Sequence, residues 1–147
     1  MQFQNILVPV IGTEADEEAI KLACRLAKPD KAKICAVHVI PIERTLPLDT
    51  EKVDEVQKAE DILNHMEAVG RSEGCAVDTD LLQARAAGPT IVDEAGERDI
   101  DLIVMGVEYK TRFGQFSLGT VMPYVLKNAP CRVILYHQYP DNPEEVK

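Results

Sequence analysis

Short apolar runs alternate along the chain with stretches whose apolar residues recur every three or four positions. The run Ile6–Val10, bounded by Gly12, is typical of a strand buried on both faces. From Thr13 to Ala27 the apolar residues follow the helical period, and Thr13 or Glu14 begins the segment where an N-cap and early acidic residues belong. The same analysis predicts further strands at 32–40, 75–84, 101–106 and 131–136, and further helices at 50–70, 88–98 and 120–128.

The longest predicted helix follows a loop that contains two prolines, PIERTLPLDT. Asp49 and Thr50 are both suitable N-caps for it, and Gly70 and Gly74 close it. Its apolar residues keep spacings of three and four, which predicts a stripe facing the core rather than a cofactor site. The stripe consists of Val53, Val56, Ala59, Ile62, Leu63, Met66 and Val69.

Strands that alternate with helices indicate βαβ units, which have right-handed crossovers and parallel sheets. The expected fold class is therefore α/β, an open sandwich around a parallel sheet of about five strands. At 147 residues the chain has the size of one domain. We expect that domain to span residues 1–138, followed by a polar tail at 139–147 with too little apolar content to fold.

The composition is that of a soluble globular protein, with 46% hydrophobic and 28% charged residues. No uncharged run approaches the roughly 18 residues of a membrane-spanning helix, and no basic leader precedes the first apolar run. A cytoplasmic location is therefore expected. The formal net charge of −9 disfavours nucleic acids and anionic membranes as partners, because both attract positive surfaces.

One segment, residues 107–120, departs from this acidic average. Its only acidic residue is Glu108, against Lys110 and Arg112, so the segment carries +1 and the rest of the chain, given the total of −9, carries −10. Two cations in an acidic chain indicate an anion site, although solvated surface cations would produce the same pattern. Both cations can pair with phosphate, Arg112 in a bidentate manner, and Ser117 adds a hydroxyl donor.

The reactive side chains form no catalytic pattern. Cys24, Cys35, Cys75 and Cys131 show neither a CxxC pair nor a histidine at metal-ligand spacing, so we predict reduced thiols and no metal site. Local motifs supply no Ser-His-Asp, Cys-His or paired-carboxylate arrangement. We therefore predict no catalytic residues and, at most, weak nucleotide hydrolysis. None of the cysteines is expected to act as a nucleophile, and Cys75 should react fastest because it lies in a predicted loop.

Three segments of the chain together resemble the universal stress protein family. They are ILVPVIGT, AAGPTIVDEAGERDIDLIVMG and SLGTVMPYVLKNAPCRVILY, and in this order they span nearly the whole chain. The resemblance implies a Rossmann-like sheet of the adenine nucleotide alpha hydrolase type, with strand order 3-2-1-4-5. It also implies a homodimer paired through the last strand, Arg132 to Tyr136, and in one branch of the family a bound ATP.

The nucleotide motif of that family is a glycine, two residues, a second glycine, nine residues, and a third glycine followed by Ser or Thr. On this chain the first glycine is Gly106 and the closing pair is Gly119 and Thr120, with the spacing intact. Tyr109 stands at the middle glycine, and Ile11 stands where nucleotide-binding members carry an aspartate that contacts the nucleoside. The nucleotide-binding residues implied by the resemblance, together with the two loop cations, are Pro9, Ile11, Val39, Met105, Gly106, Tyr109, Lys110, Arg112, Ser117, Gly119, Thr120 and Val121.

Each feature of this motif has a physical consequence. Gly106 is expected to end its strand at a sharp turn, and Gly119 with Thr120 to begin a helix whose amides and dipole attract phosphate oxygens. Tyr109 is strained in the positive-φ conformation that glycine permits, and its ring occupies space that phosphate would need. Ile11 replaces a polar contact with apolar surface, which weakens the selection of ribose or base.

Two functions follow from these observations. The first is a stress or regulatory module that holds ATP or AMP between the ends of the first and fourth strands, with Mg²⁺ only when ATP is bound. The second is a homodimeric interaction protein of the same fold that has lost the nucleotide. In both cases the last strand, CRVILY, carries apolar side chains on both faces at an edge of the sheet, and pairing with a second copy would cover that edge.

Overall fold

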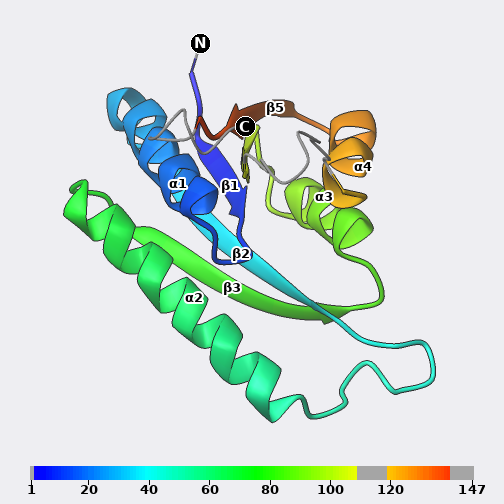
Figure 1. Ribbon diagram of the computed structural model, residues 1–147. Coiled ribbons are helices and arrows are strands. Elements are labelled where there is room, and N and C mark those ends of the chain that lie inside the picture. The colour runs from blue at the N-terminus through cyan, green and yellow to red at the C-terminus, as the bar shows by residue number, and fades with distance from the viewer. Residues whose placement is uncertain (1, 109–118, 140–147) are drawn as a thin grey trace.

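A single parallel sheet forms the centre of the molecule (Figure 1), and the computed structural model describes residues 2–108 and 119–139. The strand order is β3-β2-β1-β4-β5, and every neighbouring pair is parallel. This confirms the α/β fold class and the order that the family resemblance implied. The strands are β1 (Asn5–Pro9), β2 (Lys33–Pro41), β3 (Val77–Ala84), β4 (Leu102–Val107) and β5 (Arg132–His137).

Helices cover both faces of the sheet. They are α1 (Glu14–Ala27), α2 (Val53–Ser72), α3 (Ala87–Glu97) and α4 (Val121–Asn128), with a short 3-10 turn, η1 (Lys28–Asp30), after α1. Helices α1 and α2 bury one side of the sheet, and α3 and α4 bury the other, so that the core has two layers. None of the helices in residues 2–108 and 119–139 is both long enough and apolar enough to cross a membrane.

Helix α1 begins where the sequence pattern placed it. Thr13 is the N-cap, and its hydroxyl accepts a hydrogen bond of 3.1 Å from the backbone N–H of Asp16. The Asp16 side chain returns to the Thr13 N–H, which completes a capping box. This reciprocal pair fixes the direction in which the chain leaves β1 and enters α1.

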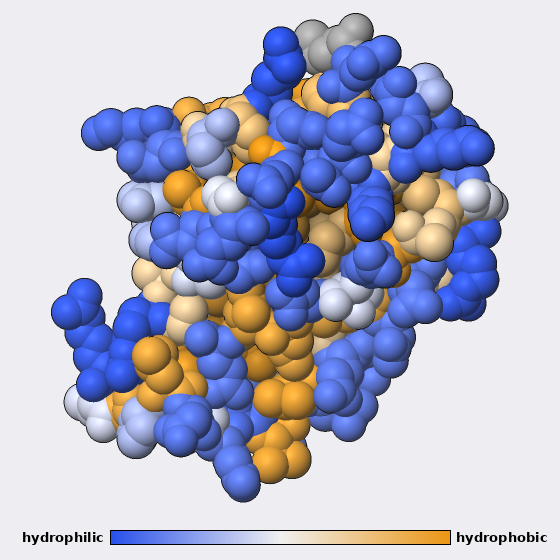
Figure 2. All heavy atoms as spheres, turned by 180° about the vertical axis from the view of Figure 1, so that it is seen from behind, coloured by the Kyte–Doolittle hydropathy of each residue, from blue (hydrophilic) through white to orange (hydrophobic). Residues whose placement is uncertain are grey.

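Helix α2 begins later than predicted. Its first residue is Val53 and its N-cap is Lys52, which makes no side-chain capping bond. Thr50 instead donates its hydroxyl to the carbonyl of Pro47 at 2.6 Å, so neither Asp49 nor Thr50 caps the helix. Val53 is 72% exposed and does not belong to the core stripe. Figure 2 shows apolar surface at the end of the molecule where α2 begins, beside the long β2–β3 pair.

The end of α2 also differs from the prediction. Gly70 lies inside the helix rather than at its end, because α2 continues to Ser72. A Cβ on Gly70 would lie 2.4 Å from Cγ2 of Val77, so the glycine allows the helix to pack closely against β3. Gly74, with φ of +73°, makes the turn that follows.

Strand β5 forms one edge of the sheet, next to β4. As predicted, its side chains divide between the two faces: Val133 and Leu135 pack on the α3 and α4 side, and Ile134 packs on the α1 and α2 side. All three remain partly accessible in the single chain.

Candidate functional site

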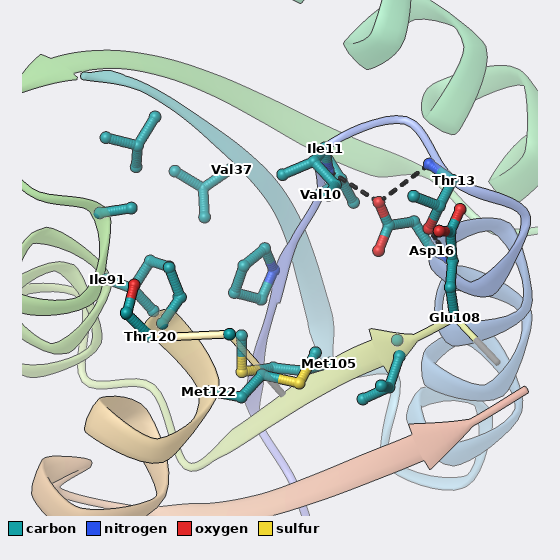
Figure 3. Close-up of a pocket in the computed structure, with 17 residues that line it drawn as sticks. Val10, Ile11, Thr13, Asp16, Val37, Ile91, Met105, Glu108, Thr120 and Met122 are labelled. Atoms are coloured by element: carbon teal, nitrogen blue, oxygen red, sulfur yellow. Dashed lines mark hydrogen bonds between the residues drawn. The ribbon is translucent and has the colours of Figure 1, made fainter. Parts of the chain in front are cut away.

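A cavity of about 280 Å³ opens at the carboxyl ends of β1, β2 and β4 (Figure 3). Helix α1 and the first turns of α3 and α4 complete its walls. In an open parallel sheet, this is the crevice in which ligands bind, because the chain leaves neighbouring strands in opposite directions there. The cavity therefore lies where the sequence predicted a site, between the ends of the first and fourth strands.

The structure brings together most of the residues predicted for this site. Those that line the cavity are Pro9, Ile11, Val39, Met105, Gly106, Gly119, Thr120 and Val121. They come from β1, β2, β4 and the start of α4, segments that are far apart in the sequence. The four others, Tyr109, Lys110, Arg112 and Ser117, lie outside the described residues.

One side of the cavity is apolar. Val37 from β2 and Ile91 from α3 face the space from one direction, and Met105 from β4 and Met122 from α4 line it from below in the view of Figure 3. Val37, Ile91 and Met105 are all buried, so they hold this wall rigidly in the core. Such a surface suits a flat apolar ring, and methionine sulfur adds favourable contacts with aromatic ligands.

The opposite side is polar and contains a residue that sequence analysis missed, Asp16. Its Oδ2 accepts hydrogen bonds from the backbone N–H groups of Ile11 (2.7 Å), Gly12 (3.0 Å) and Thr13 (3.2 Å). Asp16 is only 3% exposed. Burial raises the pKa of its carboxyl above the ordinary value, and this outweighs the three backbone hydrogen bonds, which lower it. The signal in the sequence was the spacing Thr-x-x-Asp, a capping-box pattern that returns the acid to the end of β1.

Gly106 has a different role from the one predicted. It lies within β4, in register with Tyr136, and not at a sharp turn after the strand. A Cβ on Gly106 would lie 2.3 Å from the carbonyl oxygen of Ala15 and 2.9 Å from the backbone nitrogen of Asp16. The first turn of α1 thus rests directly on the backbone of β4, and this contact brings Asp16 to the wall of the cavity.

The remaining edges of the cavity carry Ile11, Glu108 and the turn into α4. The side chain of Ile11 is 72% exposed, so this position presents apolar surface at the mouth, as the sequence indicated. Glu108 follows β4 and lines the cavity beside α1. Gly119 has φ of +67°, a conformation that favours glycine, and Thr120 is the N-cap of α4 without a side-chain capping bond.

The four cysteines lie away from this cavity. Cys24 is fully buried on α1, and burial together with a hydrogen bond to Cys75 raises the pKa of its thiol to about 12. Burial raises the pKa of Cys35 to about 11. Cys131 is half-buried and lies just before β5, not on a buried strand as predicted. The part of the chain that the structure describes contains no group of three or more His, Cys, Asp or Glu side chains that could hold a metal ion.

Comparison with known proteins gives consistent matches along the chain. The model of the universal stress protein family matches residues 2–137. A universal stress protein of Methanocaldococcus jannaschii is 30% identical over 139 residues, which cover 90% of this chain and 81% of that protein.

Solved structures agree with this match. The universal stress protein from Archaeoglobus fulgidus in complex with dAMP superimposes with a TM-score of 0.72 at 26% identity, covering 92% of this chain and 98% of the other. The universal stress protein UspA from Lactobacillus plantarum superimposes with a TM-score of 0.70 at 26% identity, covering 92% and 99%.

Proposed function

Because the chain belongs to the universal stress protein family, we propose that it is a regulatory module that binds an adenine nucleotide, ATP or AMP, at the ends of β1 and β4. The observation that carries this proposal is the cavity itself, which has an apolar wall on one side and hydrogen-bonding groups on the other. The dAMP complex of the Archaeoglobus fulgidus relative supports it.

In the proposed complex, the adenine ring lies against the apolar wall formed by Val37, Ile91 and Met105. Burial of a flat ring there removes apolar area from water at about 25 cal/mol for each Å². The phosphates extend toward Gly119 and Thr120 at the start of α4, where backbone amides and the helix dipole favour negative charge. Mg²⁺ accompanies ATP only, through its phosphate oxygens.

The loop cations are expected to supply most of the phosphate affinity, because Tyr109 stands in place of the middle glycine of the motif. Binding is then weaker than a complete motif would provide and falls as the salt concentration rises. Arg112→Ala removes a charge-assisted hydrogen bond, which costs about 1.5–3 kcal/mol, or roughly ten- to a hundredfold in affinity. Tyr109→Gly restores the positive-φ option and should leave the affinity unchanged or raise it.

Two measurements test the proposal. Mass spectrometry of protein purified under native conditions should detect a bound adenine nucleotide, and calorimetric titration with ATP and AMP should give saturable binding to the parent. The same titration of Arg112→Ala and Tyr109→Gly checks the role of the loop. If the parent releases no heat and only Tyr109→Gly binds, the tyrosine has closed the site, and the protein is an interaction module without a nucleotide.

We further propose that the protein works as a cytoplasmic homodimer without catalytic turnover. Strand β5 is an edge strand with partly accessible apolar side chains on both faces. Pairing it with the same strand of a second copy would satisfy its open backbone groups and cover Ile134, Val133 and Leu135. A chain of this size buries a smaller fraction of its surface on folding than a larger protein does, so association through β5 would bury further apolar surface.

A further inference from the structure

Two of the four cysteines are neighbours in the folded chain. Cys24 lies in the last turn of α1, and Cys75 lies in the turn that joins α2 to β3. A hydrogen bond joins the two thiols, and Cys75 packs against the same apolar cluster to which Cys24 belongs. Figure 1 shows the end of α1 and the α2–β3 turn on the same side of the molecule. All of β2 and α2 lies between the two residues in the chain, which is why the sequence alone predicts no nucleophilic cysteine.

The two thiols differ in their access to solvent. Cys24 is fully buried, whereas Cys75 is partly exposed and lines a surface hollow of about 370 Å³. The end of α2, the turn after it and the start of β3 form this hollow, which shares no lining residue with the cavity at the ends of β1 and β4. A reagent that enters the hollow therefore meets Cys75 first.

We propose that Cys24 and Cys75 form a reversible dithiol site that reacts with low-molecular-weight disulfides, the class to which oxidised glutathione belongs. The thiolate of Cys75 attacks one sulfur of the reagent, which breaks the S–S bond of the reagent and releases one half as a thiolate. Cys24 then attacks the Cys75 sulfur, forms the Cys24–Cys75 disulfide and expels the second half. The two cysteines lose two electrons, the reagent gains them, and the two cysteine protons end on the two released thiols. This inference does not depend on the proposed nucleotide function.

The electrostatics of the pair support this order of attack, because the thiolate and not the thiol is the nucleophile. Burial raises the pKa of Cys24 to about 12, and the hydrogen bond to Cys75 and the charge of Cys75 add to this effect. Cys24 therefore keeps its proton while Cys75 is unreacted. Once Cys75 is part of a mixed disulfide its sulfur carries no charge, so its opposition to the ionisation of Cys24 ends at the step in which Cys24 has to attack.

The turn that carries Cys75 suits the closure of the bond. The two sulfur atoms have to approach from hydrogen-bonding distance to about 2.05 Å. Apart from its chain neighbours, Gly74 has no described atom within 4 Å of an added Cβ, so the turn is not packed tightly on that side. The N–H of Cys75 donates to the carbonyl of Gly70 at 2.9 Å, which keeps the thiol beside the end of α2. The resulting disulfide would tie α1 to this turn and restrict the unfolded chain.

Two neighbouring thiols can also be inert, packed as small hydrophobic groups, and the two explanations predict different products. In an inert pair, Cys75 stops at the mixed disulfide with the reagent and Cys24 stays reduced. In a dithiol site, the mixed disulfide is transient. The adjacent Cys24 then acts at an effective concentration above the millimolar range of a flexibly linked group, and it displaces the reagent.

The experiment incubates the native full-length chain at pH 8 with oxidised glutathione at about 1 mM, below that effective concentration, and follows the products by intact mass and by peptide mapping after alkylation. The parent should accumulate the Cys24–Cys75 disulfide in at least about tenfold excess over the mixed disulfide. Cys24→Ala, which keeps the buried position apolar, should stop at the mixed disulfide on Cys75. Cys75→Ala should leave Cys24 reduced. Cys131→Ala is the matched control, because it removes a partly buried thiol outside the pair, and it should form the disulfide as the parent does.

Three products would overturn the assignment: a parent that stops at the mixed disulfide, a disulfide that joins other cysteines, or a parent that remains reduced. The oxidised parent should also have a Tm about 5–15 °C above that of the reduced parent, and excess reducing dithiol should restore the original Tm. A lower Tm after oxidation would show that the bond forms only by disrupting the native packing, and it would overturn the assignment as well. Cys24→Ser replaces Cys24→Ala, with the same expectation, if circular dichroism shows that the alanine variant does not fold.

Discussion

Replacing Gly106 by alanine should destabilise the protein more than any other glycine-to-alanine change in the described chain. The added Cβ would lie 2.3 Å from the carbonyl oxygen of Ala15, 2.5 Å from its carbonyl carbon and 2.9 Å from the backbone nitrogen of Asp16. All three atoms belong to the backbone of α1, so no side-chain rotation can relieve the overlap. Either α1 or β4 has to move.

The size of the effect follows from what surrounds these elements. Inserting a methyl group into a packed core costs about 1–3 kcal/mol when side chains can adjust. Here the obstacle is a helix turn that is itself capped and buried, so we expect a loss of about 3 kcal/mol or more in the free energy of unfolding. That is a large part of the roughly 5–15 kcal/mol by which proteins are stable.

Urea denaturation followed by circular dichroism at 222 nm measures the effect, at two protein concentrations so that association is controlled. Gly96→Ala is the matched control, because its added Cβ on α3 would have no described atom within 4 Å apart from its chain neighbours and the backbone of its own helix turn. It should raise stability by about 0.5–1 kcal/mol, the ordinary helix preference for alanine. Gly70→Ala should fall between the two, since its Cβ meets a side chain, that of Val77. A Gly106→Ala protein within 0.5 kcal/mol of Gly96→Ala would refute this account of the contact.

Three further predictions follow from the same structure. Burial raises the pKa of Asp16, so the native state binds the carboxyl proton more tightly than the unfolded chain does. The contribution of this group to the free energy of unfolding therefore falls as the pH rises from 3.8 through the raised pKa. In urea titrations across this range, Asp16→Asn should lose that pH dependence and be at least as stable as the parent at neutral pH. Asp16→Ala should lose about 1–3 kcal/mol in the free energy of unfolding, because the three backbone N–H groups lose their acceptor. Equal stabilities of the two variants would contradict this. A thiol reagent at pH 8 should label Cys75 first. Cys24 and Cys35 should react slowly, because their raised pKa values of about 12 and about 11 leave little thiolate. Rapid stoichiometric labelling of Cys24 would contradict this prediction. Light scattering should give a mass near twice 16.3 kDa at micromolar concentration, and the monomer mass would reject the dimer.

Several features of the molecule could be predicted from short stretches of sequence. The apolar runs located all five strands to within two residues at each end, and the helical spacings located the helices. Thr13 was one of the two residues predicted to begin α1, because an N-cap side chain and early acidic residues belong at the start of a helix. The cavity could be placed because the carboxyl ends of neighbouring parallel strands always meet at one edge of the sheet.

The start of α2 shows why local signals can fail. Asp49 and Thr50 are good caps by composition, but the loop before α2 is held by contacts with β3. The side-chain amide of Gln83 donates to the carbonyl oxygens of Leu48 and Thr50. These bonds fix the path of the loop, and the helix begins only at Val53, beyond both predicted caps.

The sequence by itself determined the α/β class, the faces of the strands, the start of α1 and the edge of the sheet where a ligand would bind. Each of these depends on neighbours within a few positions or on a general rule of parallel sheets. The tertiary structure alone decided what Gly106 and Asp16 do. Their roles depend on how closely the first turn of α1 approaches β4, and that distance is set by the packing of segments far apart in the chain. Periodicity carries no information about such a contact, since a glycine in a turn and a glycine beneath a helix look the same in sequence.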